Sequence, residues 1–309
     1  QLTSLARTCS GIGDAIPTVL TMTVVPILGA GSSMADYKIG FKWWALIIAV
    51  VFVISELVCV VCVPERPVAC DEKPGKISDM FKALFKNDQA MTVVVSIILV
   101  YTSLNICGNL VLYFFRFDVG NEGAYSIFAA VAFAAQVLVM MVIPLLRKRF
   151  SKSQLFISGF IIQIAGFAVI LIMAFAKLYT PQSWYILCLP GILIYLGYGM
   201  LNVIMTIFLS DSVDYGEVMN GTREESVIFS MQTFTVKLAS GVAVFLAGLV
   251  VDWIHLDTAA AVQTQDTLDA LRMWMTIPSV ILLIVGIFIF KRFYKLDDTR
   301  MEEIKSKLN

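Results

Sequence analysis

A lysine and a group of acidic residues stand out in one passage of an otherwise apolar chain, SDSVDYGEVMNGTREESVIFSMQTFTVKLASG at residues 210–241. Lys237 lies about ten residues into an apolar run. A lysine at the middle of a membrane helix costs ~2.5–3.5 kcal/mol on insertion scales, so it needs a partner or a water-filled cavity. A cation in this place indicates a pathway for an ion or a polar solute.

The residues around Lys237 form a polar stripe. Ser230, Thr233 and Lys237 are spaced by three and four, which places them on one face of a helix, and Gln232 lies nearby. Polar stripes on membrane helices either join helices by hydrogen bonds or line a solute pathway. The charge on Lys237 favours the pathway.

A second polar face occurs in the segment VYTSLNICGNLVLYFFRF. Tyr101, Asn105, Asn109 and Tyr113 follow one another at steps of four residues, which aligns them along one side of a helix. Amides and rings in such a row suit a sugar, because sugar hydroxyls need donors and acceptors and pyranose faces stack on aromatic rings. Hydrogen bonds between asparagines of neighbouring helices are an equally good interpretation.

The acidic part of the opening passage also has a regular spacing. Asp211, Asp214 and Glu217 are three residues apart, so they share a face if the preceding span continues as helix. Like charges repel, and Arg223 is the nearest counter-ion in the sequence. Such a network could be formed in one conformation and broken in another, as a latch. A solvated loop is the alternative, and the abutment to two spans argues against it.

Composition sets the class of protein. The 309 residues are 59% hydrophobic and 15% charged, with a mean hydropathy of +0.83, too apolar for an ordinary soluble domain. A helix of ~20 apolar residues crosses a bilayer. Strand-like alternation is absent, so we predict an all-α membrane protein with eight spans, at roughly 13–35, 42–63, 91–115, 123–146, 155–176, 184–209, 226–251 and 274–290.

The basic residues predict the orientation. Seventeen of the 23 Lys and Arg residues lie on alternate non-membrane segments, a set that includes both chain ends. Five others, among them Arg116 and Arg272, lie on the remaining non-membrane segments, and Lys237 lies in a span. Positive residues favour the cytoplasm, so we expect both ends of the chain there. The balance of charge gives no sign of nucleic-acid binding.

The polar stretch after the second span suggests a division into parts. We expect the last two helices of one half at 1–63, a cytoplasmic linker at 64–90, a six-helix half at 91–290 and a cytoplasmic tail at 291–309. This pattern is typical of a transporter built from two halves. No P-loop, HExxH or nucleophile elbow occurs, so neither an enzyme nor an ATP-driven pump is expected.

The residues at 211–241 closely resemble the signature of the glycoside–pentoside–hexuronide:cation symporter family. YFFRFDVGN at 113–121, the linker with PERP and FKALFKN, and QLTSLARTCSGIGDAIP at the start are similar to further parts of that family. The resemblance covers essentially the whole chain. It implies a major-facilitator fold of twelve helices, of which this chain holds helices five to twelve, and no cofactor beyond a co-transported Na⁺, H⁺ or Li⁺.

The resemblance also implies roles for individual residues. Arg7 matches a sugar-contacting arginine, and Thr233 and Lys237 match residues of the sugar and cation site. The cytoplasmic charged network of the family corresponds to Asp211, Asp214, Glu217 and Arg223. Asn202 stands where a sugar-contacting tryptophan is found, and this departure puts a galactoside substrate in doubt.

The main cation ligands of the family lie on helices one, two and four, outside this sequence. We therefore expect an upstream portion, and we expect that the chain does not transport alone. The leading hypothesis is a monomeric, cation-coupled sugar symporter of the bacterial inner membrane. A transporter of a lipid-like solute and a non-transporting membrane sensor or scaffold are the alternatives.

Overall fold

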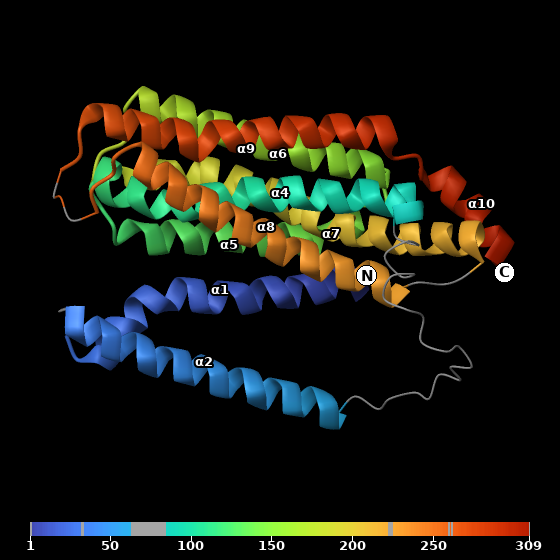
Figure 1. Cartoon of the computed structure of the whole chain (residues 1–309), viewed down its shortest axis with the longest axis horizontal. Helices are drawn as coiled ribbons and strands as arrows, with labels where there is room; N and C mark the ends of the chain where they lie inside the picture. Colours follow the sequence, from blue (N-terminus) through green and yellow to red (C-terminus); the bar gives the residue numbers. More distant parts are fainter. Residues whose placement is uncertain are drawn as a thin grey trace. The chain divides into compact units, whose positions relative to one another are not determined.

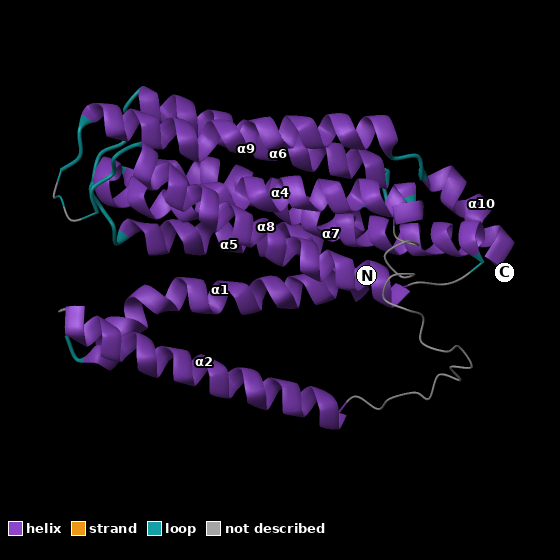
Figure 2. Ribbon diagram, in the orientation of Figure 1, coloured by secondary structure: helices purple, strands orange, loops and turns teal. Residues whose placement is uncertain are grey.

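A computed structural model describes residues 2–31, 34–62, 85–221, 225–258, 260 and 262–308. These residues are almost entirely helical and contain no strand, as Figure 2 shows. The chain divides into two compact units: Ile12–Lys76 is one, and Gln1–Gly11 together with Ile77–Asn309 is the other. The predicted linker at 64–90 lies outside the described residues as far as residue 84.

Helix α2 and most of helix α1 supply the smaller unit. α1 runs from Leu2 to Gly29 and α2 from Met34 to Cys62. The indole Nε1 of Trp44 donates a hydrogen bond of 2.8 Å to Thr21 Oγ1 and so joins the two helices. The predicted spans at 13–35 and 42–63 fall on these helices.

Six long helices make up the bundle of the larger unit (Figure 1). They are joined in sequence by short connections, and an eleven-residue helix follows them: α4 Asp88–Tyr113, α5 Ala124–Leu146, α6 Lys152–Phe175, α7 Cys188–Asn220, α8 Glu225–Trp253, α9 Gln265–Phe293 and α10 Asp298–Leu308. Seven helices of the described chain, α2 and α4 to α9, are long and apolar enough to cross a membrane. The prediction of an all-α membrane protein is confirmed.

Within the bundle, α7 and α9 extend furthest beyond their predicted spans. α7 continues eleven residues beyond 209, and its 33 residues measure roughly 50 Å, more than the ~30 Å hydrocarbon core. Gly221 ends it with a left-handed φ of 74°, which costs glycine little. α9 begins at Gln265 rather than 274, capped by Thr264. Both extensions carry polar residues, which a search for apolar runs leaves out.

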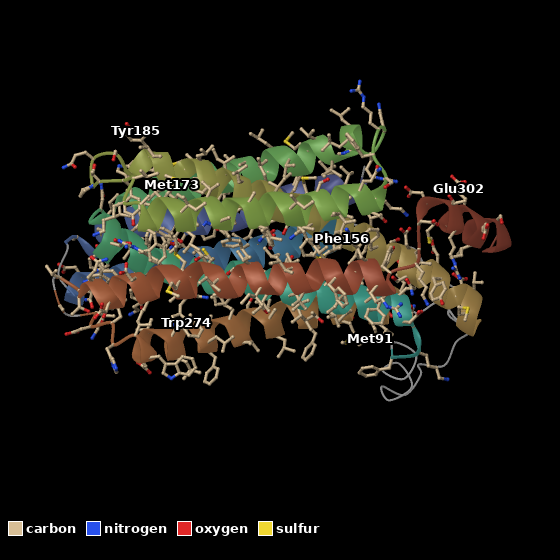
Figure 3. All side chains as sticks on the ribbon, turned by 90° about the horizontal axis from the view of Figure 1, so that it is seen from above. Met91, Phe156, Met173, Tyr185, Trp274 and Glu302 are labelled. Atoms are coloured by element: carbon tan, nitrogen blue, oxygen red, sulfur yellow. The ribbon has the colours of Figure 1, made fainter. Side chains whose placement is uncertain are left out.

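The core of the bundle is aromatic and tightly packed. Phe156 on α6 lies 5.1 Å from Phe208 on α7 and 4.4 Å from Phe290 on α9, measured between ring centroids; Figure 3 labels Phe156 among the side chains of the bundle. α6 and α7 approach closely at Gly159 and Gly197, where a Cβ on Gly197 would lie 2.5 Å from the Gly159 carbonyl oxygen. Small residues allow this approach in membrane helices.

A buried ion pair fixes one end of the bundle. α4 passes into a π-helix at Phe114–Val119, and Asp118 in that segment receives two bonds, of 2.7 and 2.6 Å, from the guanidinium of Arg272 on α9. Tyr179, in the connection after α6, donates a third bond of 2.8 Å to Asp118. Burial and the neighbouring Asp118 carboxylate raise the pKa of the Tyr179 hydroxyl. Arg272, counted between two predicted spans, lies on α9, and its charge is paired inside the bundle with Asp118 and Asp269.

Candidate functional site

The first part of the candidate site is a polar cluster between α4 and α7. The amide nitrogen Nδ2 of Asn202 on α7 donates a hydrogen bond of 2.7 Å to the hydroxyl of Tyr101 on α4 and lies 3.4 Å from the hydroxyl of Tyr198. The two tyrosine rings meet edge to face at 5.5 Å. Asn202 is buried and Tyr101 is half-buried. The structure thus brings together two of the predicted substrate residues, Tyr101 and Asn202.

The two asparagines of α4 bond to their own helix. Asn105 Nδ2 donates to the Tyr101 carbonyl and Asn109 Nδ2 donates to the Asn105 carbonyl, each at 2.7 Å. Both side chains are half-buried. These bonds are within α4 rather than between helices, so the alternative of interhelical asparagine pairs gains no support from them.

The polar stripe of α8 faces away from the bundle. Ser230, Thr233 and Lys237 are exposed, whereas Gln232 and Thr235 on the same helix are buried. Lys237 forms no ion pair or hydrogen bond with any residue in the described part of the chain. The stripe is therefore separate from the packed face of α8, which is the arrangement that a pathway wall requires.

Gln232 connects α8 to the α7 cluster. Its Nε2 lies 3.3 Å from the hydroxyl of Thr206, and that hydroxyl donates to the Asn202 carbonyl at 3.1 Å. Arg7 belongs to α1, but its side chain lies outside the described residues, so its predicted sugar contact stays a prediction.

The second part of the candidate site is a charged network at the opposite end of the bundle from Asp118. Lys152 at the start of α6 forms a buried ion pair with Asp211 on α7. Its ammonium also lies 3.5 Å from Asp298 of α10, and Asp298 is 3.3 Å from Arg147. We call these four residues the Lys152 network. It joins α6, α7, α10 and the turn after α5.

Two other predicted members of the latch, Asp214 and Glu217, lie on the same extension of α7. Asp214 and Glu217 are half-buried, and both take part in interactions. α7 remains helical through residue 220, so the condition for a shared face is met. Gly216 lies against Asn87, and Asn87 Nδ2 donates to the Ser212 carbonyl at 2.8 Å. Arg223 lies outside the described residues, and Lys152 is one partner that the structure gives Asp211.

The predicted tail contains a helix that docks on this network. Leu296, Met301 and Ile304 are buried against Tyr215, Val218 and Tyr294. Burial raises the pKa of the Tyr294 hydroxyl, and Asp211 and Asp298 add to that effect. Apolar contacts on one side and Asp298 on the other thus hold α10 against the end of α7.

We predict that the docking of α10 weakens in acid. Partial burial raises the pKa of the Asp298 carboxyl, but Arg147 and Lys152 outweigh it, so the pKa lies below its ordinary value. Asp298 therefore stabilises the docked helix above the pKa of the unfolded chain, and this contribution is lost as the pH falls through the lowered folded value.

Hydrogen exchange of residues 298–308 measures this effect, with the Asp298→Asn variant as the reference at each pH. At neutral pH the wild type should be better protected than this variant by less than about tenfold, since exposed pairs contribute ~1 kcal/mol or less. The difference should vanish in acid. Equal protection at neutral pH would show that Asp298 does not hold α10.

Sequence reasoning missed Lys152, Arg147 and Asp298 as members of the network. Lys152 lies between two predicted spans and Asp298 lies in the predicted tail, where charged residues are expected to be solvated. One local signal was available: Lys152 follows Ser151, whose hydroxyl caps α6, and a lysine in the first turn of a helix opposes the helix dipole. A cation in that position indicates a carboxylate partner elsewhere.

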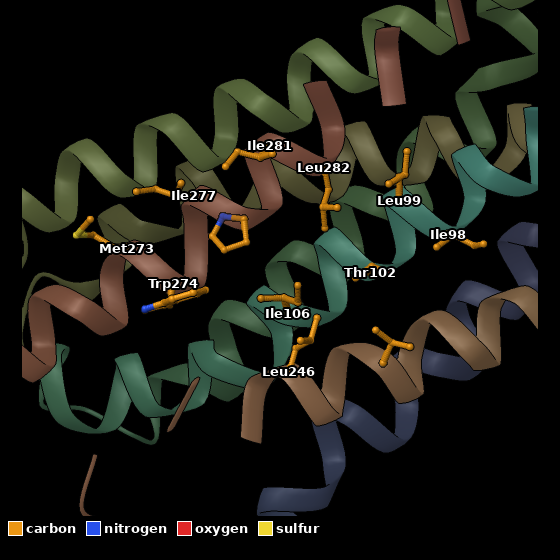
Figure 4. A pocket seen from close by; sticks show the side chains of 12 residues that line it. Ile98, Leu99, Thr102, Ile106, Leu246, Met273, Trp274, Ile277, Ile281 and Leu282 are labelled. Carbon is orange, nitrogen blue, oxygen red and sulfur yellow. The ribbon is translucent and has the colours of Figure 1, made fainter. Parts of the chain in front are cut away.

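The described bundle also contains an apolar crevice between α4, α8 and α9 (Figure 4). Its volume is about 710 Å³. Thr102 is the one hydroxyl-bearing residue of the lining, which otherwise consists of hydrophobic side chains such as Ile98, Leu246 and Trp274. Sugar hydroxyls without partners are costly to bury, so this crevice does not suit a sugar.

Comparison with known proteins identifies the family to which the chain is similar. Residues 1–298 match the family model described as MFS/sugar transport protein. The chain is similar to the raffinose carrier protein of Pediococcus pentosaceus (24% identity, 99% of this chain and 47% of the relative) and to the isoprimeverose transporter of Lactiplantibacillus pentosus (24%, 96% and 60%). It is also similar to the lactose permease of Lactobacillus delbrueckii subsp. bulgaricus (21%, 100% and 49%).

The chain spans about half the length of the curated relatives that it matches. The family and these relatives are transporters rather than enzymes, as the sequence predicts. The resemblance to the glycoside–pentoside–hexuronide symporters is confirmed. With the family model covering nearly all of its residues, this chain belongs to the MFS/sugar transport protein family.

Proposed function

We propose that the protein to which this chain belongs carries a sugar or glycoside through the membrane together with Na⁺ or H⁺, by alternating access of two helical halves. The observation that carries the proposal is the cluster of Tyr101, Tyr198 and Asn202, which places phenols and an amide inside a bundle of membrane helices. Amides and phenols both donate and accept hydrogen bonds, as sugar hydroxyls do.

Lys237 supplies the link to the cation. Its charge lies on the outward face of α8, beside Thr233, and needs a carboxylate or water-filled surroundings at membrane depth. We assign Thr233, Lys237, Arg7, Asn105 and Asn109 to the wall of the pathway. Carboxylates from helices upstream of this chain would complete the cation site.

The Lys152 network would act with the predicted latch residues Asp214, Glu217 and Arg223. Joined across the ends of α6, α7 and α10, these charges can hold one arrangement of the helix ends and release it in another. We place this end of the bundle in the cytoplasm, with both ends of the chain, and the protein in a bacterial inner membrane as a monomer. We keep the division at 1–63, 64–90, 91–290 and 291–309.

Sugar counterflow tests the substrate class without any ion gradient. The full-length protein is reconstituted in vesicles loaded with raffinose, lactose or isoprimeverose, and entry of the labelled sugar is followed. We expect counterflow with at least one of them, and none with a sugar alcohol of the same size. Absence of counterflow with any glycoside would contradict the proposed substrate class.

A further inference from the structure

Three buried side-chain amides among the described residues of the bundle have incomplete hydrogen bonding, and two of them, Asn202 and Gln136, belong to helices α7 and α5. The side-chain oxygen of Asn202 on α7 and that of Gln136 on α5 are buried and accept no hydrogen bond from the described residues. The two residues are 8% and 4% exposed. A buried polar group without a partner is unfavourable, so each one needs an explanation, and a ligand that binds and leaves is one such explanation.

Tyr101 and Tyr198 occupy one end of the Asn202 amide. Both hydroxyls lie on the Nδ2 side, at 2.7 and 3.4 Å. An amide has a donor end and an acceptor end, and two phenols on the same side serve only one of them. In either orientation of the amide, the other end is left to bind a further polar group.

Gln136, on α5, lies beside the part of α7 that carries Tyr198 and Asn202. A Cβ on Gly199 would lie 2.9 Å from the backbone carbonyl oxygen of Gln136 and 3.3 Å from its Cγ. The absence of a side chain at Gly199 therefore lets α5 approach α7. Gly199 directly follows Tyr198. Gln136 Nε2 also lies 3.8 Å from the Cβ position of Gly11, which belongs to the same unit and follows Arg7 by one helical turn.

We propose, on the basis of the sugar transport proposed above, that Gln136 and Tyr198 are further residues of the sugar site. Gln136 and Asn202 accept hydrogen bonds from two hydroxyl groups of the sugar. Tyr198 is a positioning residue, because its hydroxyl holds the Asn202 amide with one end open. The site thus recognises sugar hydroxyls through uncharged side chains on α5 and α7.

Matched substitutions of two buried glutamines test the role of Gln136. Gln163 on α6 is also fully buried, with both amide atoms unpartnered among the described residues, but it lies against Gly197 on another face of α7. Gln136→Leu should raise the half-saturating concentration of the transported sugar about tenfold, the effect of one lost hydrogen bond to a buried partner. Gln163→Leu should leave it unchanged. Equal effects of the two substitutions would overturn the proposal.

Monodeoxy analogues of the transported sugar give a readout that a purely structural role would not change. In the wild type, the analogue lacking the hydroxyl that binds Gln136 should compete about tenfold less well than the parent sugar. In Gln136→Leu, parent and analogue should compete equally, while the other analogues keep their ranking. A wild type that does not distinguish any monodeoxy analogue would overturn the assignment even if the variant failed to fold.

Tyr198→Phe and Tyr195→Phe form the second matched pair. Tyr195 lies on the same helix and packs edge to face on Phe133 at 5.3 Å and on the Tyr198 ring at 6.5 Å. The hydroxyl of Tyr198, not that of Tyr195, bonds to Asn202, and both substitutions keep the aromatic ring. One monodeoxy analogue lacks the hydroxyl that binds Asn202. Tyr198→Phe should reduce the preference for the parent sugar over this analogue, and Tyr195→Phe should leave that preference unchanged. Absence of counterflow with any sugar in the wild type would contradict the proposed function itself. Counterflow in the wild type, together with Gln136 and Tyr198 variants that behave like the wild type, would contradict only the present inference.

Discussion

Replacing Lys237 with alanine should abolish sugar accumulation while leaving the fold intact. The side chain lies on the exposed face of α8 and forms no ion pair or hydrogen bond with the described residues, so its loss should remove little packing from the six-helix bundle. A lysine at membrane depth costs ~2.5–3.5 kcal/mol unless a partner or water compensates, so a lysine kept there has another use. Melting temperature should stay the same or rise.

Lys177→Ala is the matched control for this substitution. Lys177 is an exposed residue after α6, with one side-chain bond of 3.4 Å to Gln265. Uptake of the transported sugar by vesicles should fall to background in Lys237→Ala and remain at the wild-type level in Lys177→Ala. Normal accumulation by Lys237→Ala would show that the lysine is only a surface residue.

Replacing Lys152 with methionine should destabilise the bundle by about 3 kcal/mol, the lower end of the cost of breaking a buried ion pair. The side chains of Lys152 and Asp211 are 8% and 7% exposed, so the substitution leaves a carboxylate in a poorly hydrated place. Replacing both residues, in Lys152→Met with Asp211→Leu, should recover most of the loss. Thermal unfolding of the detergent-solubilised protein measures the wild type and the two variants.

Lys148→Met controls for the removal of a positive charge at the same end of the bundle. Lys148 is exposed in the turn before α6 and should tolerate the change. If the network is a latch, Lys152→Met should also change the turnover of counterflow more than the apparent affinity for sugar. A double variant as unstable as Lys152→Met alone would contradict the coupling between the two residues.

Most of the fold could be predicted from the sequence, because membrane helices are specified locally by runs of apolar residues. The predicted spans fall largely on helices. The spacing of Asp211, Asp214 and Glu217 predicted a shared face only on the condition that the span continued as helix, and α7 meets that condition. The predicted ends were less accurate, since polar helical turns outside the hydrocarbon core carry no apolar signal. α7 and α9 both show this.

The ion pairs could not be predicted, because their partners are distant in sequence. Lys152 and Asp211 are 59 residues apart, and Asp118 and Arg272 are 154 apart. Periodicity shows which face of a helix a residue occupies but not which helix packs there. Tyr198 was missed for a related reason: the packing of α4 on α7 brings the Tyr101 hydroxyl to Asn202 and completes the cluster to which Tyr198 belongs.

Gradient-driven uptake tests the central claim most directly. Vesicles containing the full-length protein are given an inward gradient of Na⁺ or H⁺, and accumulation of the counterflow-active sugar is compared with and without an ionophore that dissipates the gradient. We predict accumulation above the external concentration with one of the two cations and its loss with the ionophore. Uptake that only equilibrates the sugar, whatever gradient is imposed, would contradict the symporter account.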